Sequence, residues 1–215
     1  MDSSNQKGKK KKKKITEVRI FPVPFPLKKN QENITNTFFK PSKEQIINQA
    51  LNFHSQGNIS EAEKCYQYCI NHGFNDYRVF TNYGVILKNL GKLQEAESSY
   101  RKAIELQPNL ADAHLNLGGI LRDIGNLEEA ELSTRKAIEL NPNFAEAHSN
   151  LGSILRDLGK LKEAEISTRK AIKLNPTFVD SYLNLGGILR DLGKLKEAEV
   201  STRKVIELNP NYSSA

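Results

Sequence analysis

Apolar side chains recur at helical spacing through most of the chain, in units of 34 residues. Within a unit they fill positions 7, 11 and 14, then 17, 20, 27, 28 and 30. A glycine suited to a left-handed helix cap stands at position 15, and a proline stops the unit at position 32 in four copies. Each unit is therefore predicted to form a helix, a tight turn and a second helix. The units are 43–76, 77–110, 111–144, 145–178 and 179–212.

This pattern resembles the tetratricopeptide repeat, whose unit is 34 residues. The matching residues are the position 20 alanines and the pairs at positions 7–8, namely Tyr83-Gly84, Leu117-Gly118, Leu151-Gly152 and Leu185-Gly186. The resemblance implies an all-α, right-handed α-solenoid of five repeats, because stacked helix pairs bury an apolar face that no single pair can bury. The first unit departs from the pattern, with Phe74 in place of proline, and is predicted to be a divergent cap.

Positive charge is confined to the head of the chain. Residues 1–42 hold 11 lysines and arginines against 3 acids, whereas the repeats are almost balanced. The head contains the lysine run Lys7 to Lys14 and the proline-rich run Ile20 to Leu27, and is expected to be disordered. The lysine run either confers solubility or holds a weak anionic partner such as RNA or lipid, whereas the balanced repeats are not a basic nucleic-acid platform.

Several functional classes find no support in the residues. Cys65 and Cys69, one helical turn apart, suggest neither a disulfide framework nor a zinc site, and no membrane span or signal peptide is evident. No catalytic constellation or phosphate-binding loop is present, so we expect no enzyme activity, cofactor, metal or small-molecule substrate. The two histidines at position 4, His114 and His148, are expected to pack. A cytoplasmic protein is the default expectation.

The candidate binding residues are columns that recur on the first helices. At 100° per residue, positions 2, 6, 9 and 13 lie opposite the expected core positions 4, 7, 8 and 11, and position 12 borders them. Position 6 is asparagine in four repeats, which can bind a peptide backbone because its amide both donates and accepts. Small residues at position 9 are expected to leave room for the peptide. The candidate peptide-binding residues are Asn82, Asn116, Asn150 and Asn184, with Asp123, Asp157 and Asp191, and Arg122, Arg156 and Arg190.

The asparagine column resembles the asparagine ladder in the repeats of peptide O-linked N-acetylglucosamine transferases, and the array resembles tetratricopeptide proteins of bacterial type. The resemblance implies a non-catalytic scaffold that binds extended peptides in a groove. Two alternative interpretations stay open. In the first, the regular columns result from duplication alone. In the second, the three arginines pair with acids of the next repeat.

The last residues carry a further expectation. Residues 213–215 would begin a sixth repeat, and the fifth keeps the apolar residues Val200, Val205, Ile206 and Leu208 on its second helix. Either the chain is a fragment of a longer protein or this helix packs against something else. The alternative function is therefore the substrate-recruiting region of a transferase, a glycosyltransferase or sulfotransferase, whose catalytic domain lies outside the chain.

Overall fold

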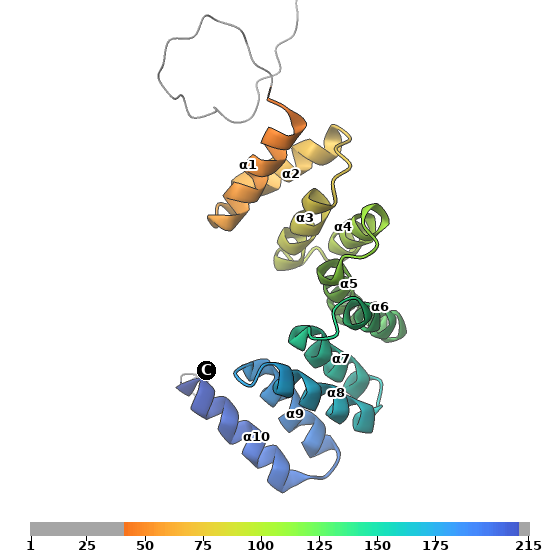
Figure 1. The fold of residues 1–215 in the computed structure, drawn as a ribbon, viewed down its shortest axis with the longest axis vertical. Coiled ribbons are helices and arrows are strands. Elements are labelled where there is room, and N and C mark those ends of the chain that lie inside the picture. Colours follow the sequence, from red (N-terminus) through yellow and green to blue (C-terminus); the bar gives the residue numbers. More distant parts are fainter. Residues whose placement is uncertain (1–40, 211–215) are drawn as a thin grey trace, which may run out of the picture. The chain divides into compact units, whose positions relative to one another are not determined.

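The computed structural model describes residues 41–210, and in this range the chain forms ten α-helices and no strand (Figure 1). Helices with odd numbers begin repeats and are called first helices, and those with even numbers are called second helices. The first helices are α1 (Lys43–Ser55), α3 (Tyr77–Asn89), α5 (Ala111–Asp123), α7 (Ala145–Asp157) and α9 (Val179–Asp191). The second helices are α2 (Ile59–Asn71), α4 (Leu93–Leu106), α6 (Leu127–Leu140), α8 (Leu161–Leu174) and α10 (Leu195–Leu208).

The ends of the helices follow from local sequence. Ser42 and Gln45 form a capping box at the start of α1, in which each side chain bonds the backbone N–H of the other residue. The glycines at position 15 all have positive φ, as the left-handed cap requires: Gly57, Gly91, Gly125, Gly159 and Gly193. The predicted alternation of helix, tight turn and helix is therefore confirmed.

Each internal first helix is packed on two sides. α7 contacts its own partner α8 and the preceding second helix α6, and it also touches the first helices α5 and α9. Position 10 is consequently fully buried, with Ile86, Ile120, Ile154 and Ile188 no more than 1% exposed. The burial of this position and of position 3 was not predicted from the sequence, because only a single buried stripe was expected on each first helix. The α-solenoid class itself is correct.

Close approach between the two helices of a pair depends on the glycine at position 8. A methyl group added to Gly152 would overlap the Thr168 hydroxyl of α8, and one added to Gly84 would lie 2.8 Å from the Tyr100 ring. Position 24, aromatic in the early repeats and threonine in the late ones, is thus the residue that meets this glycine. The Thr168 hydroxyl donates a hydrogen bond to the Ala164 carbonyl at 2.9 Å, so this buried threonine hydroxyl has a hydrogen-bond partner within its own helix.

The expectations for the head fall outside the described residues. The lysine run and the proline-rich run both lie within residues 1–40, outside the range that the structure describes. Within the described part of the chain, no helix has the length and apolar character needed to cross a membrane.

Candidate binding surfaces

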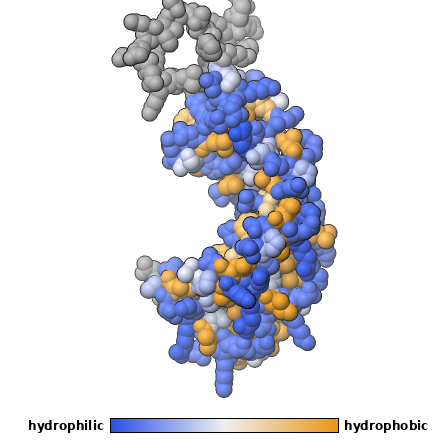
Figure 2. Space-filling view, in the orientation of Figure 1, coloured by the Kyte–Doolittle hydropathy of each residue, from blue (hydrophilic) through white to orange (hydrophobic). Residues whose placement is uncertain are grey.

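The asparagine column occupies equivalent points of α3, α5, α7 and α9. All four asparagines are half-buried, so they are neither sealed in the core nor fully exposed. On the side of the array where α3, α5 and α7 lie, Figure 2 shows the surface hollowed. We call the surface that carries this column the first-helix face.

The four asparagines differ in their hydrogen bonds. The Asn82 amide donates to the Arg78 carbonyl of its own helix at 2.8 Å, and the Asn184 amide donates to the Ser149 hydroxyl of the preceding repeat at 3.1 Å. For Asn116 and Asn150, no residue within 41–210 forms a hydrogen bond with the side chain. Two of the four amides therefore form no side-chain hydrogen bond within residues 41–210.

Arginine and aspartate columns beside the asparagines are joined across repeats. Arg122 Nε lies 2.6 Å from Asp157 Oδ2, and Arg156 Nε lies 2.5 Å from Asp191 Oδ2. The pairing that was the alternative prediction for these arginines is thus present. The hydrogen bond from Arg156, together with the charge of its guanidinium, holds the pKa of the Asp191 carboxyl below its ordinary value.

The two ends of this ion-pair column are unpaired or weakly paired. Asp123 has no ion-pair partner among residues 41–210. The Arg190 side chain is 68% exposed, and its Nε lies 3.8 Å from Asp191, which Arg156 already binds. Lys88, at position 12 of the second repeat, lies beside the Asp123 end, with its Nζ 3.7 Å from where a Cβ of Gly119 would be, so the charge that stays poorly balanced is that of Arg190.

The room expected at position 9 is not available in the fourth and fifth repeats. A Cβ atom on Gly187 would lie 2.7 Å from Arg156 Nη1, so the arginine of the preceding repeat occupies that space. Ser153 is buried, and its hydroxyl donates to the Ser149 carbonyl at 3.4 Å. The expectation that small residues leave space for a peptide was wrong for these two repeats, because the small residues make space for the neighbouring repeat.

The second helices carry their own ion pairs. Each of α4, α6, α8 and α10 has a glutamate and an arginine joined at i,i+4: Glu97–Arg101, Glu131–Arg135, Glu165–Arg169 and Glu199–Arg203. Lysines of the next repeat add a second partner, with Lys160 bound to Glu131 and Lys194 to Glu165, each at 2.7 Å. These lysine hydrogen bonds are the largest cause of the lowered pKa of both glutamates.

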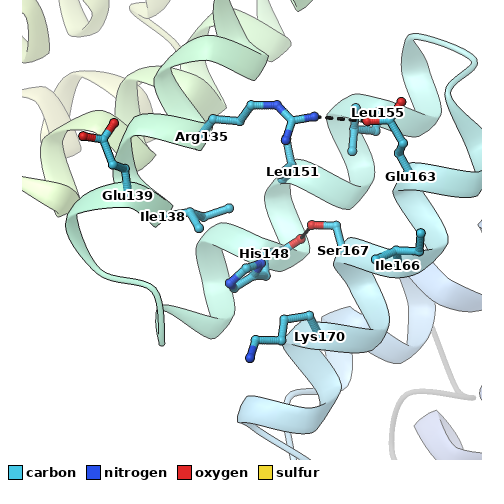
Figure 3. A pocket seen from close by; sticks show the side chains of 10 residues that line it. All are labelled: Arg135, Ile138, Glu139, His148, Leu151, Leu155, Glu163, Ile166, Ser167 and Lys170. Atoms are coloured by element: carbon cyan, nitrogen blue, oxygen red, sulfur yellow. Dashed lines mark hydrogen bonds and ion pairs between the residues drawn. The ribbon is translucent and has the colours of Figure 1, made fainter.

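A groove between consecutive second helices was not predicted from the sequence. It has a volume of about 570 Å³ and lies between α6 and α8, with His148 and Leu151 of α7 between them (Figure 3). Ile138 and Ile166 supply apolar walls, and Arg135, Glu139, Glu163 and Lys170 lie at its rim. An equivalent groove of about 550 Å³ lies between α8 and α10, lined by Ile172, Leu185 and Val200. We call the two the outer grooves.

Position 22 of the unit was the sequence signal for these grooves. It is apolar from the third repeat onward and faces outward, with Leu132 68%, Ile166 70% and Val200 68% exposed. The equivalent residues of the first two repeats are Lys64 and Ser98. From the sequence, Val200 was noted only as part of the apolar pattern of the last helix, and Leu132 and Ile166 were not predicted because they lie outside the predicted core stripe.

The histidines at position 4 are bonded to the backbone of the preceding repeat, and both cysteines are buried. The ring Nε2 of His114 and of His148 donates to the carbonyl of Pro108 and Pro142, respectively, at 2.9 and 3.1 Å. The position 4 side chain therefore joins a first helix to the end of the preceding repeat. Cys65 and Cys69 are buried free thiols, and burial raises their pKa to about 11 and about 12. Residues 41–210 contain no group of three potential metal ligands.

Comparison with models of known protein families identifies the family of these stacked helix pairs. A model described as "Cilia and flagella-associated protein 70 middle TPR-like domain" matches residues 48–155, half of the chain. Two models described as "Tetratricopeptide repeat" match residues 145–178 and 168–200. The chain belongs to the tetratricopeptide repeat family. No curated protein matches it.

Solved tetratricopeptide structures share the fold. MamA from Desulfovibrio magneticus RS-1 is 24% identical with a TM-score of 0.69, over 79% of this chain and 96% of that chain. YrrB, described as a tetratricopeptide protein with an unusual peptide-binding site, is 22% identical with a TM-score of 0.66, over 80% and 89%. A thermophilic tetratricopeptide protein of Thermus thermophilus is 19% identical with a TM-score of 0.64, over 79% and 92%. The specific resemblance to peptide O-linked N-acetylglucosamine transferases stays a prediction.

Proposed function

We propose that the protein is a non-catalytic scaffold that binds extended peptide segments of partner proteins along its first-helix face. The observation that carries the proposal is the pair Asn116 and Asn150, one repeat apart, half-buried and without a hydrogen-bond partner among residues 41–210. Neither side chain is among the buried polar atoms without a partner, so both amides reach solvent, where a peptide backbone can replace water as donor and acceptor.

The ion-pair column favours a direction for the bound segment. Arg122 and Arg156 are each paired with an aspartate of the next repeat. Their charges are therefore balanced and are not expected to attract a charged side chain of the peptide. Arg190, at one end, is only weakly paired and attracts negative charge. We therefore expect an acidic side chain of the peptide near Arg190.

The fold neighbours agree with a role in protein interaction. The description of YrrB names a peptide-binding site on a tetratricopeptide fold, and this chain shares that fold over most of its length. A long, repeated surface favours a ligand that is itself long, since each repeat contributes a similar increment of binding energy. A weak anionic partner for the lysine-rich head and a cytoplasmic location remain predictions.

The proposal is tested by the double variant Asn116→Ala with Asn150→Ala. Peptides selected on the full chain from a random dodecapeptide display library are measured by fluorescence polarisation on both proteins. Two lost hydrogen bonds cost about 1–3 kcal/mol, so affinity is expected to fall roughly 5- to 150-fold. Alanine is the better helix former, so the variant stays folded.

Asn82→Ala is the matched control, because the Asn82 amide is already bound within its own helix. It removes the same side chain at the same position of the second repeat and is expected to leave the affinity unchanged. If every selected peptide binds the double variant and wild type equally, the asparagine column is not the binding site.

A further inference from the structure

The outward-facing column at position 22 is a continuous feature of the late repeats. Leu132, Ile166 and Val200 stand one repeat apart on α6, α8 and α10, and two of them line the outer grooves. Single exposed apolar side chains are ordinary, but a row of them beside apolar grooves marks an interaction surface. In Figure 2, orange apolar patches appear among polar side chains over the half of the array that holds these helices.

Unpaired positive charge lies on α8, on the same stripe of the helix as Ile166. Positions 18, 22, 26 and 29 lie on one stripe of a helix, and in α8 they are Lys162, Ile166, Lys170 and Lys173. None of the three lysines forms an ion pair or hydrogen bond with another residue of 41–210. We call these three the lysine ridge.

The sister helices lack such a ridge. In α4, α6 and α10, position 29 is a glutamate that binds the lysine at position 26, in the pairs Lys102–Glu105, Lys136–Glu139 and Lys204–Glu207. In α8 the glutamate is replaced by Lys173, so both charges are unbalanced. Lys170 lines the first outer groove and Lys173 the second, which places the ridge between the two hollows.

We propose that the outer grooves and the lysine ridge form a second docking surface, which binds an acidic segment of a partner protein. One apolar side chain of the segment enters the groove at Ile138, Leu151 and Ile166, and another enters the groove at Ile172, Leu185 and Val200. Carboxylates between them contact Lys170 and Lys173. This surface is separate from the first-helix face and extends the proposed function to two simultaneous partners.

The charges favour such a segment over a second copy of the chain. A symmetric pairing about Ile166 would bring the lysine ridges of two copies together, where like charges repel. The glutamates at the groove rims are already engaged, Glu163 with Arg135 and Glu207 with Lys204. An acidic segment instead supplies the counter-charge that the ridge lacks within residues 41–210.

The variant Ile166→Ser with Lys173→Glu tests the surface in the full chain. It gives α8 the residues that α4 has at these positions, Ser98 and Glu105, so it is expected to fold. Peptides from a random dodecapeptide display library are selected on wild type and depleted on this variant. The surviving peptides are expected to combine leucine or isoleucine with several acids, and to bind the variant at least about tenfold more weakly, a loss of roughly 1.4 kcal/mol.

Two controls distinguish this surface from the first-helix face and from a general effect of net charge. Lys64→Glu makes the same change of charge on α2, far from α8 in sequence, and is expected to leave the affinity unchanged. Asn116→Ala with Asn150→Ala is also expected to have no effect on these peptides, so failure of the proposed function and failure of this inference give different results.

The inference is overturned if no peptide distinguishes wild type from the α8 variant, or if the selected peptides lack acids. It is also overturned if sedimentation equilibrium shows a dimer that the variant abolishes, since the occupant would then be a second copy. Binding of phosphatidylserine vesicles through α8, with no acidic peptide recovered, would replace a protein partner by a lipid surface.

Discussion

The first-helix face and the outer grooves are built from the same repeat but treat their charges differently. On the first-helix face, Arg122 and Arg156 are each neutralised by an aspartate of the next repeat. At the outer grooves, three lysines of α8 have no partner within residues 41–210. In α4, α6 and α10, by contrast, the lysine at position 26 forms an ion pair with the glutamate at position 29. Duplication preserves a pairing wherever both residues are copied. A single substitution in one copy, such as lysine for glutamate at position 173, therefore creates a surface unique to that copy.

The largest effect on stability is expected in the packed core between a first helix and a second helix. Gly152→Ala places a methyl group against the Thr168 hydroxyl, and overpacking of this kind costs about 1–3 kcal/mol, partly offset by the better helix propensity of alanine. The free energy of unfolding, measured by urea denaturation, is expected to fall by roughly 1–2 kcal/mol.

Gly186→Ala is the matched control one repeat on. There the added methyl lies 3.3 Å from the Thr202 hydroxyl, on an exposed residue that can move. The stability is expected to stay equal or rise by up to about 1 kcal/mol. Equal losses in both variants would show that the close approach at Gly152 is not the cause.

A smaller effect per substitution is expected from the ion pairs between second helices. Glu131→Gln with Glu165→Gln removes carboxylates whose pKa is held below the ordinary value of 4.5 by hydrogen bonds from Lys160 and Lys194. Such carboxylates stabilise the fold above their unfolded pKa, and the contribution is lost as pH falls through the lower folded pKa. The cost at pH 7 is roughly 0.5–1 kcal/mol per site, because the partners are exposed.

The measurement compares urea denaturation of this double variant and wild type at pH 7 and in steps below pH 4.5. The two curves are expected to differ at pH 7 and to converge in acid. Glu199→Gln serves as control, because Glu199 is 62% exposed and bonded to Arg203 of its own helix. A gap between the double variant and wild type that is unchanged at low pH would mean that ionisation of the glutamates is not what stabilises the array.

The smallest effect on stability is expected from Lys173→Glu alone. The change removes a cation from the last turn of α8, which costs about 0.3–1 kcal/mol, and adds an i,i+3 pair with Lys170 that contributes about 0.2–0.5 kcal/mol. The free energy of thermal unfolding should thus fall by no more than about 0.8 kcal/mol. A larger loss would indicate that Lys173 serves the fold, and would weaken the contrast between the two faces.

The sequence by itself predicted much of what depends on neighbours along the chain. The 34-residue period placed the helix pairs, and Gly125 and its equivalents marked the left-handed caps. These features depend on contacts within one turn or one pair of helices, where spacing along the chain determines distance in space. The asparagine column was also predicted from the sequence, because its residues recur at the same position of each 34-residue unit.

Only the tertiary structure decided the features that involve two repeats. The burial of Ile154 and its equivalents, the Arg156 side chain over Gly187 and the outer grooves all depend on how far one helix pair is rotated and shifted against the next. That geometry is set by side-chain packing at the interface, which a period does not specify. It also determined that Asn184 is bonded to Ser149 while Asn116 and Asn150 find no partner within residues 41–210, although the three occupy one column in the sequence.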